Sequence, residues 1–126
     1  QSRSYDPFVD KDVDVFGLGK FDLITSFEVF EHVPDATRLI ADLVSLLAHD
    51  GLIYFSTLLS EGQVVPGQRL GWWYAAPRNG HISLYTRKSL TLLGARHGLG
   101  FGSFTANLHA YWRRVPAWAQ HLFASA

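Results

Sequence analysis

Residues 21–35 decide the fold, and they read FDLITSFEVFEHVPD. The segment opens with a short apolar run, typical of a parallel strand covered on both faces, and Pro34 and Asp35 then begin a helical pattern. Two carboxylates and an imidazole stand between these parts, at Glu28, Glu31 and His32. Because ligands of open α/β sheets bind at the carboxyl ends of strands, the segment predicts a strand that leads into a functional site.

The residues that follow predict a strand, helix, strand unit. Apolar residues recur at helical spacing from Asp35 to Leu47, and Gly51 is expected to end the helix. A strand is expected next, over Leu52 to Leu58. Units of this kind are almost always right-handed, with their two strands parallel.

The second half of the chain predicts one more long helix and a final strand. The helix is expected over about 87–97, with Thr86 as its N-cap and Gly98 at its end. The glycines at 98–102 are expected to form a helix exit that leads into a strand near 104–112. A short amphipathic helix is expected after Pro116.

The motif F-D-x-I-x-S-x-E-V-x-E-H-V-x-D in residues 21–35 resembles the fourth strand and following turn of class I S-adenosylmethionine-dependent methyltransferases. Downstream, residues 46–57 resemble the leucine-rich helix, glycine and fifth strand of that family, and residues 80–90 resemble its later helix entry. The resemblance covers roughly residues 4–112. It implies an α/β, partial Rossmann-like fold with a mostly parallel sheet and flanking helices.

The resemblance begins partway through the family's pattern. The family places a first strand and a G-x-G-x-G loop ahead of this region, and neither is present in the sequence. The chain also begins at Gln1 and contains no methionine. We therefore expect residues 1–126 to be the C-terminal portion of a single, truncated methyltransferase domain that is inactive by itself.

Composition limits the classes of partner. Eleven basic residues balance eleven acidic ones, so no net charge favours nucleic acid or an anionic membrane. No apolar run approaches the ~20 residues of a membrane span. The chain has no cysteine, which excludes disulfides and thiolate metal sites. These observations predict a soluble, cytoplasmic protein.

The resemblance implies S-adenosylmethionine as the cofactor and places residues along its pocket. Asp6 matches the acidic residue that holds the cofactor ribose, and a carboxylate can accept hydrogen bonds from both ribose hydroxyls. Ser26, Phe27 and Glu28 are expected to line the cofactor at the end of the strand.

Glu28, Glu31 and His32 are spaced so that one helical turn would place all three side chains on the same side. Carboxylates and a neutral imidazole suit a divalent cation such as Mg, Mn or Zn. Some O-methyltransferases of the superfamily combine an E-x-x-E-H turn with a distant histidine, and the resemblance implies His81 as that fourth ligand. The alternative is that these residues only lock the turn and the cofactor pocket through hydrogen bonds.

The same residues are candidates for catalysis. His32 or His81 is a candidate general base, because histidine titrates near neutral pH, and Glu31 belongs to the same catalytic set. Aromatic residues in the loop after the expected second strand are candidates for substrate contact, or else form a small separate core. They are Trp72, Trp73 and Tyr74.

Two functions from different classes remain open. The first is an S-adenosylmethionine-dependent O-methyltransferase that acts on a small-molecule or sugar-like acceptor. The second is a catalytically inactive methyltransferase-like interaction module, whose exposed sheet edge would pair with another chain, including a second copy. A metal-dependent hydrolase is a weaker third reading, because the ligands lack an H-E-x-x-H order.

Overall fold

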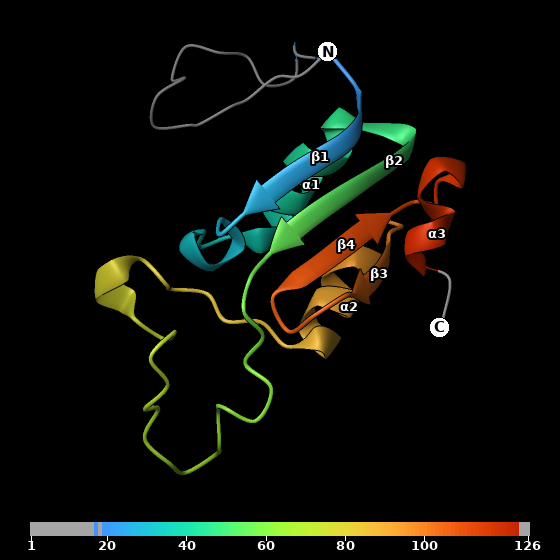
Figure 1. The fold of residues 1–126 in the computed structure, drawn as a ribbon. Coiled ribbons are helices and arrows are strands. Elements are labelled where there is room, and N and C mark those ends of the chain that lie inside the picture. The colour runs from blue at the N-terminus through green and yellow to red at the C-terminus, as the bar shows by residue number, and fades with distance from the viewer. Residues whose placement is uncertain (1–16, 18, 124–126) are drawn as a thin grey trace.

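A computed structural model describes residue 17 and residues 19–123, and the fold in this range is α/β as predicted. Its sheet has the order β1-β2-β4-β3, and Figure 1 shows the four strands side by side. The strands are β1 (Phe21–Phe27), β2 (Leu47–Ser56), β3 (Gly100–Ser103) and β4 (Leu108–Trp112). The first two are joined by helix α1 (Ala36–Leu46) and run parallel.

The described sheet is more mixed than the mostly parallel sheet expected from the sequence. Strand β4 pairs with β2 and with β3, and both pairings are antiparallel. The strand expected near 104–112 is confirmed only in its second half, as β4, because Gly100–Ser103 forms a strand of its own and residues 104–107 reverse the chain. Strands joined by so short a connection can only pair antiparallel.

Helix α1 begins as predicted but ends earlier. The Asp35 side chain caps it by accepting a hydrogen bond from the Arg38 backbone N–H, at 3.2 Å. Strand β2 starts at Leu47, not at Leu52, so Gly51 lies inside the strand and does not end the helix. A Cβ on Gly51 would lie 2.9 Å from the carbonyl oxygen of Phe21, so only glycine fits where β1 and β2 approach at an irregular register.

Helix α2 (Arg87–Ala95) starts at the predicted residue. The Thr86 and Ser89 side chains form a reciprocal capping box there. Figure 1 shows α1 and α2 on the same side of the sheet. Between them and the sheet, the ring of Phe55 stacks on Phe30 and on Tyr111, with ring centroids 4.4 and 5.0 Å apart. Phe30 precedes Glu31, so the hydrophobic core anchors the turn that carries the candidate site.

The opposite face of the sheet is partly covered by the C-terminal residues. The 3-10 helix η4 (Ala117–Ala119) and helix α3 (Gln120–Phe123) take the place of the amphipathic helix expected after Pro116. Phe123 packs on Trp112 with ring centroids 4.6 Å apart, while Leu23 and Phe27 of β1 stay about half exposed. Within the described residues, no helix combines the length and apolar character that crossing a membrane requires.

Candidate active site at the ends of strands β1 and β2

The chain leaves β1 through a backbone turn at Glu28. Glu28 has a φ of 55°, in the left-handed region that non-glycine residues rarely adopt. Its backbone N–H donates to the carbonyl oxygen of Ser56 at 3.3 Å and to the Ser56 hydroxyl at 2.9 Å. The expectation that Glu28, Glu31 and His32 share one helical turn is therefore wrong. Only Phe30–His32 are helical, as the 3-10 helix η2, because bonds to β2 hold Glu28 out of it.

Glu31 is fully buried, and its backbone ties two distant segments together. Its carbonyl oxygen accepts hydrogen bonds from Ile82 and Ser83, at 2.8 and 3.1 Å. Neither oxygen of its carboxylate has a hydrogen-bond partner among the described residues. His32 lies near this carboxylate, with its Nε2 3.7 Å from Glu31 Oε1. Buried carboxylates are normally paired, so the free oxygens of Glu31 mark a place for a proton or a cation.

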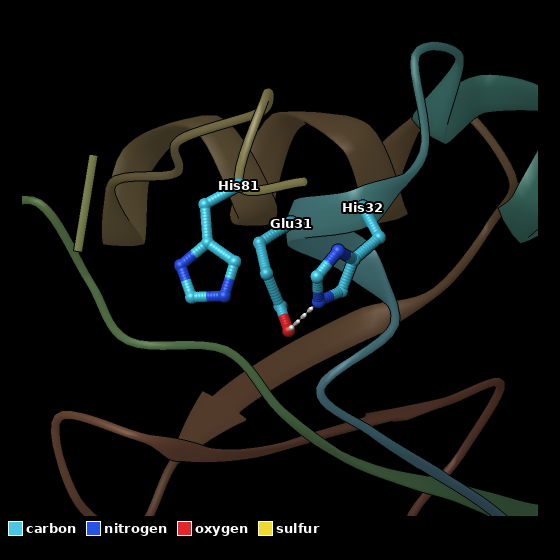
Figure 2. Close-up of side chains that lie close together, drawn as sticks. All are labelled: Glu31, His32 and His81. Carbon is cyan, nitrogen blue, oxygen red and sulfur yellow. Dashed lines mark ion pairs between the residues drawn. The ribbon is translucent and has the colours of Figure 1, made fainter. Parts of the chain in front are cut away.

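His81 reaches the same place from the long segment between β2 and α2, which Figure 1 shows returning beside η2. The Tyr74 carbonyl oxygen lies 2.8 Å from His81 Nδ1, so Nδ1 carries the hydrogen and Nε2 is left as the free nitrogen of the neutral ring. Figure 2 shows the imidazoles of His32 and His81 on either side of the Glu31 side chain. One ligand atom from each of the three residues lies within 4.8 Å of the others.

Glu28 lies outside this close group and is held by other side chains. The Tyr74 hydroxyl donates to Glu28 Oε2 at 3.0 Å, and the Ser56 hydroxyl donates to Oε1 at 3.3 Å. Tyr74 is buried, whereas its neighbour Trp73 is 74% exposed. The indoles of Trp72 and Trp73 both pack against the Tyr74 ring, with centroids 5.2 and 5.5 Å apart.

The two carboxylates differ in their affinity for protons. Burial raises the pKa of Glu31, and the nearby negative charge of Glu28 raises it further. Burial also acts to raise the pKa of Glu28, but interactions with Glu31, Tyr74 and Ser56 outweigh it, so the pKa of Glu28 is lowered. Glu28 therefore carries the negative charge of the pair, and Glu31 is ready to hold a proton or a cation.

The other predicted site residues are more dispersed. Asp6 lies outside the described residues. Ser26 is buried at the end of β1, and Phe27 is 52% exposed with its ring edge-on to Tyr54. Neighbouring residues of a strand point to opposite faces of the sheet. Ser26 and Phe27 therefore border the end of β1 from two sides.

Comparison with known sequences identifies the protein family of this chain. The family described as a methyltransferase domain matches residues 3–100. The chain belongs to this methyltransferase family. The match confirms the recognition of a class I S-adenosylmethionine-dependent methyltransferase from residues 21–35.

Curated relatives of this methyltransferase domain match a short segment. The ubiquinone biosynthesis O-methyltransferase of Actinobacillus pleuropneumoniae serotype 5b (strain L20) is 49% identical over 39 residues, which cover 31% of this chain and 17% of that protein. The enzyme of the same name from Pasteurella multocida (strain Pm70) is 51% identical over 39 residues, covering 31% of this chain and 16% of that protein. The matched segment thus spans less than a fifth of either relative.

Solved structures share the fold at low sequence identity. Magnesium protoporphyrin IX methyltransferase from Synechocystis PCC 6803, solved with bound SAH, superposes with a TM-score of 0.50 and 16% identity, over 81% of this chain and 49% of that one. The DhpI-SAM-HEP complex gives a TM-score of 0.53 and 16% identity, over 79% and 54%. The methyltransferase domain described here therefore spans about half the length of these structures.

Three residues that border the candidate site carried no site prediction from the sequence. Ser56 is the last residue of β2, beside the end of β1, and Thr57 follows it. The buried Thr57 hydroxyl has no hydrogen-bond partner among the described residues. Gly80 borders His32. Two hydroxyl residues at the end of an apolar strand were a usable signal, since neighbouring parallel strands end at the same sheet edge. Nothing in the sequence pointed to the contact of Gly80 with His32.

Proposed function

We propose that the complete protein is an S-adenosylmethionine-dependent O-methyltransferase acting on a small-molecule or sugar-like acceptor, with this chain as the C-terminal portion of its domain. The proposal rests chiefly on one observation. Glu31, His32 and His81 converge where β1 and β2 end, in a chain of the methyltransferase family. O-methyltransferases among the curated relatives support oxygen as the atom methylated.

The bound cofactor would supply an activated methyl group, so the residues of this chain mainly position the reactants and move a proton. Ser26, Phe27 and Glu28 would border the cofactor at the end of β1, with Asp6 on its ribose. His32 or His81 would accept the acceptor's hydroxyl proton. His81 fits this role because its Nδ1 is held by the Tyr74 carbonyl oxygen, which leaves Nε2 free to accept a proton.

A divalent cation such as Mg, Mn or Zn is part of the proposal. The residues present suit one, because Glu31 offers two buried oxygens without partners and His81 presents a free Nε2. Glu31, His32 and His81 would hold the cation, and Glu28 would have to leave its hydrogen bonds to Tyr74 and Ser56 to join them as a fourth ligand. The cation would lower the pKa of the acceptor hydroxyl. In the alternative, the same residues lock the turn through hydrogen bonds, with Glu31 protonated.

Activity of the full-length protein tests the proposal. Methyl transfer from labelled S-adenosylmethionine would be measured on a panel of phenolic and sugar-like hydroxyl acceptors. Glu31→Ala is expected to lower the rate at least about tenfold, because it removes a group from the reacting site. The matched control is Asp22→Ala, which removes an exposed carboxylate from β1. Equal rates for both variants would remove Glu31 from the site.

Chelation separates the cation from the hydrogen-bond alternative. If a cation takes part, exhaustive chelation abolishes methyl transfer and added Mn²⁺ or Mg²⁺ restores it. Full activity after chelation, with no metal copurifying, would eliminate the cation and leave the rest of the proposal intact.

An inactive interaction module is the second candidate. The outer edge of β1 is unpaired among the described residues, and an open edge invites pairing with another strand or a second copy of the chain. The two functions differ in a simple observation. A module would show no turnover with any acceptor in the panel, and its oligomeric state would change when β1 is altered.

A further inference from the structure

Tyr74 occupies a central position in the site, although it comes from the loop that follows β2. It is 4% exposed, whereas Trp73 beside it is 74% exposed. Its ring packs on the His81 imidazole, with centroids 4.4 Å apart. A loop residue buried this deeply makes contacts that hold the loop against the ends of β1 and β2.

The Tyr74 hydroxyl uses both of its hydrogen-bonding functions inside the protein. It donates to Glu28 Oε2 at 3.0 Å and accepts from the backbone N–H of Leu58 at 3.3 Å. Because a carboxylate oxygen can only accept, the hydroxyl is the donor in its bond to Glu28. Its single hydrogen is directed at Glu28, which leaves none for an acceptor substrate.

The backbone of the same residue orients His81. The Tyr74 carbonyl oxygen lies 2.8 Å from His81 Nδ1, which sets the tautomer that leaves Nε2 free. Partners of this kind around candidate ligands fix ring orientation and ligand basicity. Tyr74 therefore contacts Glu28 through its side chain and His81 through its main chain.

We propose that Tyr74 is a positioning residue. Its hydroxyl orients Glu28, and its carbonyl oxygen sets the tautomer of His81. The inferred effect of Tyr74 on methyl transfer rests on the proposed function, whereas its contacts with Glu28 and His81 do not. The substrate contact expected at Trp72 and Trp73 stays a prediction, while Tyr74 acts behind the reacting groups. Removing only its hydroxyl takes away one of the two hydroxyl donors to Glu28, the other being Ser56, and releases the loop at Leu58. The contact of residue 74 with His81 is expected to loosen as a result.

The test compares Tyr74→Phe with Tyr54→Phe in the full-length protein. Tyr54 lies on the opposite face of the sheet, against Phe27 and Phe104, and its hydroxyl makes no hydrogen bond among the described residues. Titration with Mn²⁺ alone, after chelation, is one readout. Tyr74→Phe is expected to weaken Mn²⁺ binding about 10- to 100-fold, and Tyr54→Phe to leave it within about twofold. Circular dichroism and thermal unfolding verify that both variants fold.

The NMR chemical shifts of the His81 ring nitrogens report the tautomer directly. This readout depends neither on metal binding nor on turnover. In the wild type His81 is expected as a single tautomer with hydrogen on Nδ1, and in Tyr74→Phe as a mixture of both tautomers. Wild-type Mn²⁺ affinity together with an unchanged His81 tautomer in folded Tyr74→Phe would overturn the inference. If the wild type binds no Mn²⁺, the cation part of the proposed function fails, and the His81 shifts alone decide on Tyr74.

Discussion

Gly80 lies directly against the imidazole of His32. A Cβ at residue 80 would stand 2.7 Å from His32 Nδ1, and Gly80 has a φ of 82°. The position thus requires glycine twice, for backbone conformation and for space. Because His81 follows immediately, the same turn places one histidine while making room for the other.

Replacing Gly80 with alanine should therefore damage the site beyond its cost to stability. Gly67→Ala is the matched control, because Gly67 has a φ of 80° and a Cβ added there would meet no atom within 4 Å. Both variants should lose about 1–2 kcal/mol in urea unfolding from left-handed strain. Only Gly80→Ala should lower methyl transfer, by about tenfold or more, because it displaces His32. Equal rates in the two variants would show that the position of His32 is unimportant.

Glu31→Gln should make the folded protein less sensitive to rising pH. The folded-state pKa of Glu31 lies above its ordinary value of 4.5, so ionisation favours the unfolded chain and stability is lost as pH rises through the folded pKa. Below 4.5 the wild type and Glu31→Gln should be similarly stable, and at neutral pH the variant should be more stable. Urea unfolding of chelated full-length protein at about pH 4 and pH 7 measures this difference.

The control for that comparison is Asp22→Asn, which neutralises an exposed carboxyl group on β1. It should leave the change of stability with pH close to that of the wild type. A Glu31→Gln variant that is less stable than the wild type at neutral pH would mean that the Glu31 carboxylate has a stabilising partner in the protein.

His109 should make the protein sensitive to acid. It is fully buried, with Nε2 2.8 Å from the carbonyl oxygen of Thr57 and Nδ1 2.8 Å from the Ser103 hydroxyl. Burial lowers the pKa of His109 below 6.5, although the bond to Thr57 opposes this. Below 6.5 the unfolded chain gains a proton that the folded chain resists, so stability falls as pH falls through the folded pKa.

His109→Gln should remove the part of the acid sensitivity that His109 causes. The glutamine amide can still donate a hydrogen bond to the Thr57 carbonyl oxygen, but it does not titrate. Between about pH 7 and pH 5, unfolding free energies of His109→Gln should change less than those of the wild type. His49→Gln, at an exposed position, should retain the wild-type dependence. Parallel curves for all three proteins would mean that His109 is not responsible.

Residues 1–126 alone should not bind S-adenosylmethionine measurably, with a dissociation constant weaker than about 1 mM. The family's glycine loop is absent from the sequence, and the outer edge of β1 is unpaired among the described residues. Calorimetry on these residues beside the full-length protein measures the difference. Micromolar binding by residues 1–126 would show that they hold a working pocket.

Short-range patterns made much of the fold predictable. The Asp35 and Thr86 caps and the apolar spacing of α1 act within a few residues, so sequence reasoning found the starts of both long helices. It missed the start of β2 and the separate strand β3. Those boundaries depend on which partner each residue meets in the sheet, Phe21 for Leu47 and Trp112 for Gly100, and the pattern of the segment itself does not show that partner.

By itself, the sequence determined the methyltransferase family and the candidate residues Glu31, His32 and His81, because their motif lies in or beside recognisable strands and turns. Only the tertiary structure decided how they work together. Hydrogen bonds from the Glu28 backbone to Ser56 keep Glu28 outside the helical turn. Tyr74 lies between Glu28 and His81 and is hydrogen-bonded to both. These contacts join residues separated by up to 46 positions, and local periodicity carries no information about such pairs.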